Sequence, residues 1–225
     1  MFQADVVNRL IAEELKAELA PAVIGREIIV LEQTSSTNDA ILEVDWPQGA
    51  AVCSPPSGKN EGLVLFADHQ TAGRGQRGNH WESGPGKGLW FSILLHPEIE
   101  MNDSWRLTIW AIEAISDVIR TELSLEAAIK LPNDIQVHGR KVAGVLVEMR
   151  AQKKAPHLAI VGIGINVNQS LRDSLQNCKT GQSRWPWPCT GQLIAKNLQS
   201  LSCEIWIGLI AKISRAVVAQ GADLG

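Results

Sequence analysis

The sequence of 225 residues has no apolar run that approaches the roughly 20 residues a membrane-spanning helix needs. It does not open on a signal peptide, because Asp5, Glu13 and Glu14 interrupt the first apolar stretch. Its four cysteines are widely spaced and form no CxxC pair; they are Cys53, Cys178, Cys189 and Cys203. Zinc sites and disulfide frameworks are therefore not expected, and thiols in a reducing compartment are the simplest interpretation. These absences predict a cytoplasmic protein.

A strong excess of either charge is also lacking, since the formal net charge is −3. This argues against a general binder of nucleic acid or of a membrane surface. There is no internal repeat and no low-complexity segment, and no spacing of serine, histidine, cysteine and carboxylate suggests a nucleophilic triad. With 45% hydrophobic residues, the composition is that of a soluble globular protein with a sizeable core.

The spacing of apolar residues predicts a short series of elements. Helices are expected over residues 5–19 and 104–122 and again from residue 190 onward, and strands over residues 27–32, 63–68, 89–95, 135–137, 142–149 and 157–168. The last strand is compatible either with pairing across a two-fold axis in a homodimer or with burial inside one sheet. Hairpins with only one or two intervening helices favour an α+β domain with a mixed, largely antiparallel sheet backed by helices, rather than a doubly wound fold.

Residues 69–81, here called the glycine–arginine loop, are the most informative stretch. Three glycines alternate with two arginines after the strand over residues 63–68: Gly73, Arg74, Gly75, Arg77 and Gly78. Glycine accepts positive φ and lets backbone amides approach a ligand, and arginine offers a planar fork suited to phosphate. The loop has neither the Walker sequence nor the dinucleotide-binding spacing. It is typical of a clamp for a phosphorylated or adenylated molecule, and a flexible surface hairpin is the alternative.

A second segment joins Lys130–Asp134 to Lys141 and Gly144 through a glycine-containing turn, His138-Gly139-Arg140. A hairpin with a three-residue turn would bring Asp134, Lys141 and Gly144 to one end of a pocket. The alternatives are a plain turn at Asn133-Asp134, because both residues favour turns, and a solvated strand lysine.

A third segment, Ser35–Asn38, has the form of a helix start, with Ser36 as the cap and Asp39 completing a capping-box-like pair. Its hydroxyls and free amides could hold a carbonyl or ureido group, although helix capping alone explains it equally well. Three of the tryptophans are interpreted as core or boundary residues: Trp90, Trp105 and Trp110. Trp81 closes the glycine–arginine loop, where a flat ring could stack on a nucleobase.

Taken in this order, the segments resemble the biotin protein ligases, the biotin–[acetyl-CoA-carboxylase] ligase and holocarboxylase synthetase family, over about residues 27–168. The matching motifs are S-T-N at residues 36–38, the loop at residues 70–81, K-W-P-N-D at residues 130–134, K-[LV]-[AC]-G-[IV]-L-[VI]-E at residues 141–148 and G-[IL]-G-[IL]-N-[VL]-N at residues 162–168. The resemblance implies the fold shared with class II aminoacyl-tRNA synthetases and a catalytic domain over residues 1–178.

The resemblance also implies a two-step reaction in which biotin and ATP give biotinyl-5′-AMP, and the biotinyl group then passes to one lysine of a biotin carboxyl carrier protein domain. The residues implied to bind biotin are Ser36, Thr37, Asn38, Gln70, Gly73, Arg74 and Gly144. Those implied to bind ATP or the adenylate are Arg74, Gly75, Arg77, Trp81, Asn133, Lys141 and Asn166. Lys141 and Arg74 would be the catalytic residues. Asp134 would lie on the side of a Mg²⁺ ion that accompanies ATP.

The sequence departs from the family pattern in the loop, where Gln76 and Asn79 stand at positions that are often arginine. Fewer charges there predict faster escape of biotinyl-AMP. Leu131 replaces the usual tryptophan of K-W-P-N-D, which is interpreted as mild repacking.

The ends of the sequence also differ from the family pattern. No winged-helix module is expected at the N-terminus, so no DNA-binding repressor role is predicted. Residues 179–225 are interpreted as a helical segment without a recognisable SH3-like barrel. Two alternatives stay open: a lipoate or octanoate ligase relative, whose R-R-x-S-G-G-G type loop is missing here, and a non-catalytic module that binds biotin or its adenylate.

Overall fold

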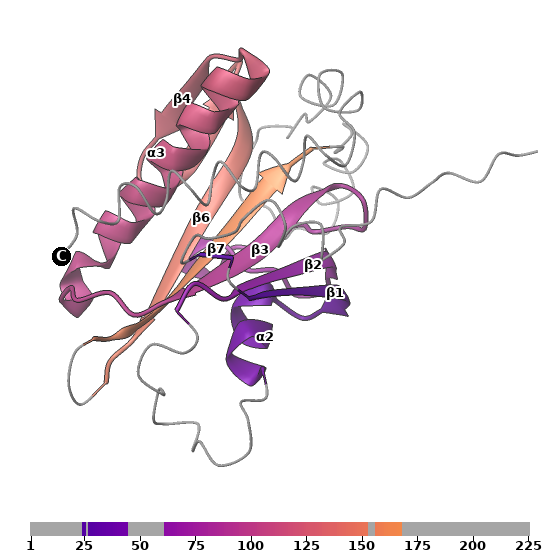
Figure 1. Ribbon diagram of the computed structural model, residues 1–225. Helices are drawn as coiled ribbons and strands as arrows, with labels where there is room; N and C mark the ends of the chain where they lie inside the picture. Colours follow the sequence, from indigo (N-terminus) through magenta and orange to yellow (C-terminus); the bar gives the residue numbers. More distant parts are fainter. Residues whose placement is uncertain (1–23, 26, 45–60, 153–155, 168–225) are drawn as a thin grey trace, which may run out of the picture.

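The computed structural model describes residues 24–25, 27–44, 61–152 and 156–167. Seven strands form one sheet in the order β1-β2-β3-β7-β6-β5-β4 (Figure 1). The strands are β1 Ile28–Thr34, β2 Val64–Gln70, β3 Gly88–Leu95, β4 Ala127–Lys130, β5 Asp134–Val137, β6 Arg140–Arg150 and β7 Leu158–Asn166. Only β1 and β2 pair in parallel, and the other five pairs are antiparallel. The predicted mixed, largely antiparallel sheet is confirmed.

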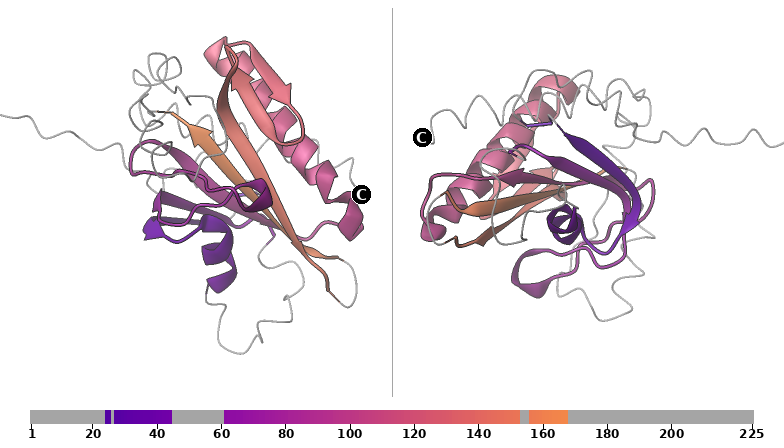
Figure 2. Two further views of the ribbon diagram at one scale, coloured as in Figure 1. Left: turned by 180° about the vertical axis from the view of Figure 1, so that it is seen from behind. Right: turned by 60° about the horizontal axis from the view of Figure 1, so that its bottom comes forward.

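Two α-helices cover opposite faces of this sheet, α2 (Thr37–Glu43) and α3 (Ser104–Leu123), as the right view of Figure 2 shows. The helix predicted over residues 104–122 is confirmed. Short 3₁₀ turns lie at Gln76–Gly78 and Met101–Asp103. Within the described residues, no helix combines the length and the apolar character needed to cross a bilayer. The predictions for residues 5–19 and 179–225, and the domain boundary at residue 178, fall outside the described residues.

The two-residue period of the strands decides which side chains reach which helix. Along β7, Val161, Ile163 and Ile165 join the large core under α3, whereas Ile160 belongs to a smaller cluster with Ile41 of α2. The same alternation sends a second set of small and polar residues to the α2 face: Ser92 of β3, Gly144 and Glu148 of β6, and Gly162 and Gly164 of β7. The site described below is built on this face.

β7 lies in the middle of the sheet. It pairs with β3 from Gly88↔Asn166 to Leu95↔Ala159, and with β6 from Ala143↔Ile165 to Arg150↔Leu158. Both of its edges are therefore used. Of the two arrangements compatible with the sequence, burial inside one sheet is the one observed, and pairing of this strand across a two-fold axis is excluded.

The turn between β5 and β6 is shorter than predicted. Val137 pairs with Arg140, so only His138 and Gly139 form the loop, with φ of 50° and 71°. Two successive positive φ values are typical of a type I′ turn, whose twist matches that of the flanking strands. The three-residue turn was the wrong expectation, because Arg140 already belongs to β6.

Trp105 also departs from its prediction, since it is 59% exposed while Trp90 and Trp110 are buried at 1% and 6%. At 100° per residue, Trp105 lies about 200° around the helix from Leu107, away from the stripe that packs on the sheet. It lies in the first turn of α3, on the side opposite the buried Leu107. The interpretation as a core or boundary residue is wrong for this tryptophan.

Candidate active site

The glycine–arginine loop is folded as a narrow hairpin rather than a loose segment. Gln70 N donates to Ser83 O, Trp81 N to Gly73 O and Gly75 N to Asn79 O, over 3.0, 2.8 and 2.7 Å. The amides of Trp81 and Gly75 are thus donated within the hairpin. Of its three glycines only Gly78 has positive φ (75°). Gly73 is needed for space, because a Cβ there would overlap the carbonyl oxygen of Trp81.

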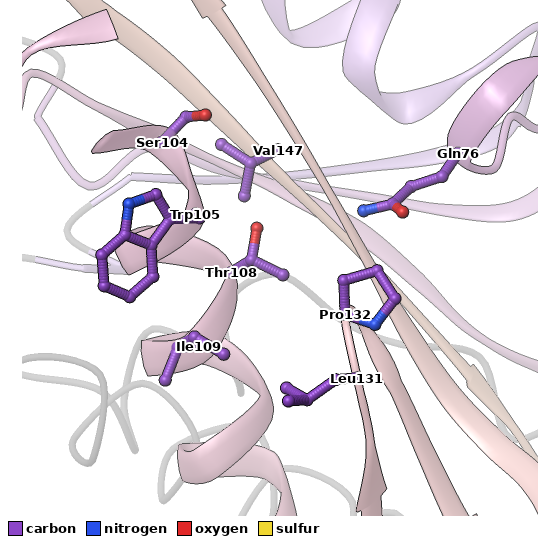
Figure 3. Close-up of a pocket in the computed structure, with 8 residues that line it drawn as sticks. All are labelled: Gln76, Ser104, Trp105, Thr108, Ile109, Leu131, Pro132 and Val147. Atoms are coloured by element: carbon purple, nitrogen blue, oxygen red, sulfur yellow. The ribbon is translucent and has the colours of Figure 1, made fainter. Parts of the chain in front are cut away.

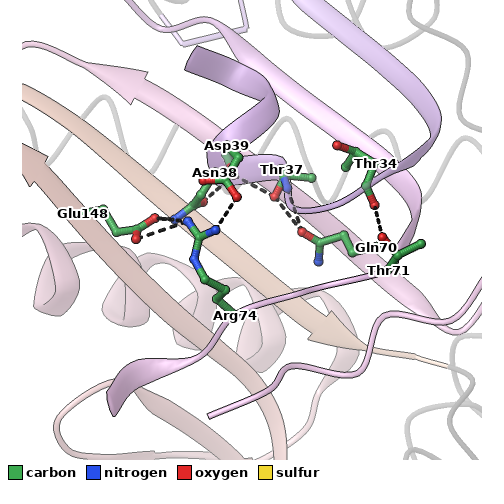
Figure 4. Close-up of polar contacts among 9 residues, drawn as sticks. Thr34, Thr37, Asn38, Asp39, Gln70, Thr71, Arg74 and Glu148 are labelled. Atoms are coloured by element: carbon green, nitrogen blue, oxygen red, sulfur yellow. Dashed lines mark hydrogen bonds and ion pairs between the residues drawn. The ribbon is translucent and has the colours of Figure 1, made fainter. Parts of the chain in front are cut away.

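A chain of buried polar side chains connects the start of α2 to this hairpin (Figure 4). Gln70 Oε1 accepts from Thr37 N at 2.8 Å, and Gln70 Nε2 donates to Ser83 Oγ at 2.7 Å. On the other side, Ser92 Oγ lies 2.8 Å from Thr37 Oγ1 and 2.6 Å from Asn38 Oδ1. One hydrogen-bond network therefore connects residues from α2, β2, β3 and the end of the hairpin. Such a network is expected, because buried polar groups need hydrogen-bond partners.

The hydroxyl protons in this network are fewer than its contacts. Thr37 and Ser92 have two hydroxyl protons, but three contacts call on them, the third being Thr37 Oγ1 to Gln70 Oε1 at 3.2 Å. The amide orientations are fixed by the Thr37 backbone donor on Gln70 and by a carboxylate acceptor on Asn38. One of the three contacts therefore has no proton between its two oxygens. The 3.2 Å contact between Thr37 Oγ1 and Gln70 Oε1 is the longest, so we assign the missing proton to it. Oxygen atoms with spare acceptor capacity thus face one another at the start of α2.

Ser36 stands at the N-cap position of α2 and is buried, yet it makes no side-chain capping hydrogen bond. Asp39 does not complete a capping box either, because its carboxylate is paired with Arg74. The helix begins where the sequence predicted, but the predicted capping interaction is absent. Backbone bonds from Asp39 N and Ala40 N to Ser36 O close the first turn instead.

Arg74 lies between two carboxylates, Asp39 of α2 and Glu148 of β6, and the Nη2–Oε2 distance to Glu148 is 2.9 Å. The hydrogen bond with Asp39 raises the pKa of Arg74 above its usual value; burial opposes this, and Glu148 adds to it. The guanidinium is therefore charged and faces a carboxylate at each of its two terminal nitrogens. An incoming anion must compete with both of them.

Lys141 forms the second charged centre. Its Nζ lies 2.6 Å from Asp134 Oδ1 and 4.8 Å from the centroid of the Trp81 ring. Asp134 pairs directly with Gly144 across β5 and β6, so the predicted meeting of Asp134, Lys141 and Gly144 is present. A cation held over an indole and beside a carboxylate is fixed in place rather than solvated.

Trp81 joins the two charged centres, because its backbone belongs to the hairpin and its ring covers β6 and β7. A Cβ on Gly144 would lie 2.8 Å from the indole, and one on Gly164 about 2.6 Å from it. Because these two positions have no side chain, the Trp81 ring can pack directly on the backbone of β6 and β7. Trp81 Nε1 is buried without a hydrogen-bond partner among the described residues.

The two predicted asparagines have structural contacts. Asn133 Nδ2 donates to Val145 O at 2.8 Å and fixes the turn against β6, and Asn166 Nδ2 approaches Lys141 O at 3.3 Å. Asn166 Oδ1 is buried and has no partner in the described part of the chain. It is an acceptor that a bound molecule could use, as Trp81 Nε1 is a donor.

The described residues do not form a metal cage of their own. They contain no group of three or more His, Cys, Asp or Glu side chains able to hold an ion. Asp134 is a single carboxylate and already faces the Lys141 ammonium. The site therefore does not fit a resident metal held by protein ligands alone.

A surface pocket of about 360 Å³ lies beside the hairpin (Figure 3). Gln76 of the loop, Trp105 of α3, Val147 of β6 and Leu131-Pro132 contribute to its walls. Leu131 is 67% exposed, so its exchange for the family's tryptophan changes a rim and not a packed interior. The interpretation as mild repacking is replaced by a change in surface shape.

The structure thus gathers most of the predicted residues into two neighbouring groups on the α2 face. The first contains Thr37, Asn38, Gln70, Gly73 and Arg74, and the second contains Trp81, Asp134, Lys141, Gly144 and Asn166. Arg77 is exposed at the hairpin tip, with φ of 59°.

Sequence reasoning missed Ser92 and Glu148. Each is a polar residue within an otherwise apolar strand. Ser92 lies two positions from Trp90, and Glu148 lies four positions from Gly144, so each shares a face of the sheet with that residue.

Comparison with known proteins agrees with this arrangement. Residues 30–166 match the model of the biotin/lipoate A/B protein ligase family. The chain therefore belongs to this family of protein ligases.

Among curated relatives, a bifunctional ligase/repressor BirA of Bacillus subtilis is 36% identical over 166 residues, covering 74% of this chain and 48% of the relative. A biotin–[acetyl-CoA-carboxylase] ligase of Mycobacterium tuberculosis is 31% identical over 149 residues, or 64% of this chain and 51% of that protein. The chain spans about half the length of these relatives.

Among solved structures, the biotin protein ligase of Aquifex aeolicus in complex with biotin and ATP superposes with a TM-score of 0.59. It is 26% identical, and the match covers 88% of this chain and 71% of that one. The fold assigned from the sheet order is thus the fold of the family.

Proposed function

We propose that this protein is an ATP-dependent biotin–protein ligase. It would activate biotin as biotinyl-5′-AMP and transfer the biotinyl group to a lysine of a biotin carboxyl carrier domain. The observation that carries the proposal is the continuous site face, on which a buried polar network with unused acceptor capacity lies next to a fixed lysine. Relatives named as biotin–[acetyl-CoA-carboxylase] ligases favour biotin among the acids that this family handles.

The polar network suits the head of biotin. A ureido group offers two N–H donors and one carbonyl, and the hydroxyl and amide oxygens around Thr37 and Gln70 are the complementary acceptors. Ser36 is buried beside them with its hydroxyl unused for capping. Gly73 and Gly144 would line the space through which the acyl chain runs toward Lys141.

The chemistry needs alignment and positive charge more than an enzyme nucleophile. In the first step an oxygen of the biotin carboxylate attacks the α-phosphorus of ATP, and pyrophosphate leaves. In the second step the acceptor lysine amine attacks the acyl carbon, and AMP leaves with its pair of electrons. Lys141 would orient the carboxylate and stabilise charge on the α-phosphate, and Arg74 would exchange a carboxylate for a phosphate oxygen.

Trp81, Asn133 and Asn166 would serve the nucleotide, with the Trp81 ring against adenine, and Gly75 and Arg77 would approach it from the loop. Mg²⁺ would enter with the phosphates of ATP, which supply most of its oxygen ligands, and Asp134 would lie on that side. A Mg²⁺ ion held mainly by phosphate oxygens is consistent with the described residues, which contain no cluster of side chains able to hold a metal ion by themselves.

Biotin-dependent exchange of labelled pyrophosphate into ATP tests the first step, and label transfer to an apo carrier domain tests the second. We expect both activities with biotin, and neither with lipoate or octanoate in its place. Exchange with lipoate but not with biotin would reassign the substrate within the family. Exchange without transfer would favour a module that binds and activates biotin without modifying a protein.

A further inference from the structure

Glu148 is the point at which three elements of the site meet. From β6, its Oε2 accepts from Asn38 Nδ2 of α2 at 2.6 Å and from Arg74 Nη2 of the loop at 2.9 Å (Figure 4). Its Oε1 lies 3.2 Å from the same Arg74 nitrogen. One carboxylate therefore connects a sheet strand, the first turn of a helix and the glycine–arginine loop. Both contacts are charge-assisted hydrogen bonds, the stronger class.

The position of Glu148 is set by the sheet. It pairs with Ile160 of β7 and points to the α2 face, two strand repeats beyond Gly144. Its side chain is 37% exposed, so water also reaches the carboxylate. Neither the biotin contacts nor the nucleotide contacts proposed above include it.

The polar network holds the hairpin from both of its arms. The outgoing arm is held at Arg74 by Glu148 and Asp39, and the returning arm is held at Ser83, which accepts from Gln70 Nε2 at 2.7 Å. The two fastenings are connected through Asn38, Ser92 and Thr37. Removal of Glu148 leaves Arg74 with Asp39 as its one carboxylate partner and leaves the returning arm in place.

We propose that Glu148 is a positioning residue that fastens the glycine–arginine loop to α2 over the site face. Asp39 contacts Arg74 alone, whereas Glu148 also sets Asn38 and through it Ser92. The consequence for activity rests on the proposed ligase function: a loop fastened over the site retains the adenylate until the acceptor arrives. The fastening itself is a property of the ligand-free protein.

Hydrogen exchange of the full chain without ligand tests the fastening. The reporters are the amides of Gly75, Asn79 and Trp81, which are protected by bonds inside the hairpin. In Glu148→Gln, an acceptor for Asn38 is kept and the charge facing Arg74 is lost. We expect the three reporters to exchange about 5-fold faster, because an exposed ion pair contributes at most about 1 kcal/mol. The exchange of the α3 amides should not change.

The matched control is Asp117→Asn, which breaks the exposed Asp117–Arg120 pair (3.1 Å) on α3 and removes the same charge. It should leave loop exchange as in the wild type. Arg74→Gln loses both carboxylate contacts and should speed loop exchange at least as much as Glu148→Gln, and adding Glu148→Gln to Arg74→Gln should change it little further. Wild-type exchange of the reporters in Glu148→Gln, or an equal increase over the whole chain, would overturn the proposal.

The activity measurement is the release of biotinyl-AMP into solution after a single turnover without acceptor. Glu148→Gln should release it several-fold faster with KM for biotin little changed, whereas Glu148→Ala should also raise that KM because Asn38 loses its acceptor. Release at the wild-type rate in Glu148→Gln would contradict the retaining role. If the wild-type chain forms no adenylate, the proposed function fails, and the exchange experiment still decides whether Glu148 fastens the loop.

Discussion

The two faces of the sheet are built on opposite principles. Under α3 the core is large and apolar, with Phe66 and Phe91 stacked at 5.0 Å and Ile112 and Ile115 fully buried against the strands. Under α2 the apolar cluster has only five fully buried members, Ile41, Leu63, Leu65, Leu94 and Ile160. Partly buried apolar side chains surround this cluster, and beside it the face carries glycines, hydroxyls, amides and two ion-paired cations.

Buried polarity separates the faces most clearly. Of the nine buried polar residues in the described part of the chain, seven lie on the α2 face, in the glycine–arginine loop or just after it: Ser36, Thr37, Asn38, Gln70, Ser83, Ser92 and Asn166. Burial of such groups costs stability unless each is hydrogen-bonded, and several of these are only partly satisfied. The α3 face therefore stabilises the fold, and the α2 face holds polar groups in fixed positions at the expense of that stability.

The largest expected effect of a single change is on the chemistry of the α2 face. Lys141→Gln removes the ammonium between Asp134 and Trp81, and adenylate formation should fall about 10²–10³-fold, as loss of one preorganised electrostatic group does in other enzymes. The free energy of unfolding should change little. Single-turnover formation of biotinyl-AMP is the measurement.

Arg140→Gln is the control for Lys141→Gln, because it removes an exposed cation from the adjacent position of the same strand. It should retain the wild-type rate. Equal losses in both variants would mean that net positive charge matters and that the position of the Lys141 ammonium does not.

The next largest effect is on stability and comes from the α3 face. Ile115→Ala leaves a cavity among fully buried residues and should lower the free energy of unfolding by about 2–5 kcal/mol. Biotin affinity, measured well below the unfolding midpoint, should stay within a factor of two or so of the wild type. Urea unfolding and titration calorimetry together check this separation. A parallel loss of affinity would show that the faces are coupled.

Two serines with equal burial sharpen the comparison further. Ser92 and Ser116 are both 0% exposed, but Ser92 contacts Thr37 and Asn38, and Ser116 Oγ has no partner among the described residues. Ser92→Ala should cost about 1–2 kcal/mol and weaken biotin binding, because it leaves Asn38 Oδ1 without a donor. Ser116→Ala should be neutral or stabilising. Thermal unfolding of the two variants is the test, and equal costs would show that hydroxyl burial alone decides.

The fold could be predicted because its signals are local. The apolar stripe of α3, the apolar runs of β2, β3 and β6, and the glycine in the β5–β6 turn are each visible in a short window of sequence. The errors are local too. The capping box at Ser36 was not formed because Asp39 had a stronger partner in Arg74, and Trp105 lies on the uncovered side of the first turn of α3.

The site could be predicted only in part, since its contacts are set by sheet register and not by spacing along the chain. Asn38 and Glu148 are 110 positions apart, and Arg74 and Glu148 are 74 apart. Lys141 and Asp134, seven positions apart on one hairpin, were within reach of sequence reasoning. The carboxylate partners of Arg74 were not, and the Trp81 ring over Gly144 and Gly164 required knowledge of which strands are neighbours.

The smallest expected effect concerns the tip of the hairpin, where Gln76 and Asn79 stand at positions that are often arginine in the family. Gln76→Arg with Asn79→Arg should slow escape of biotinyl-AMP by up to about 5-fold, because two exposed rim charges at about 0.5 kcal/mol each contribute about 1 kcal/mol together. The effect should fade at 1 M salt, where the screening length is about 3 Å. The hairpin should survive, since Asn79 contributes to it through its backbone. As a control, Asn102→Arg with Ala128→Arg adds the same charge at exposed positions of the 3₁₀ turn Met101–Asp103 and of β4, and should leave the rate unchanged. Equal off-rates in the loop variant and the wild type would mean that retention depends on the Arg74 fastening and not on charge at the tip.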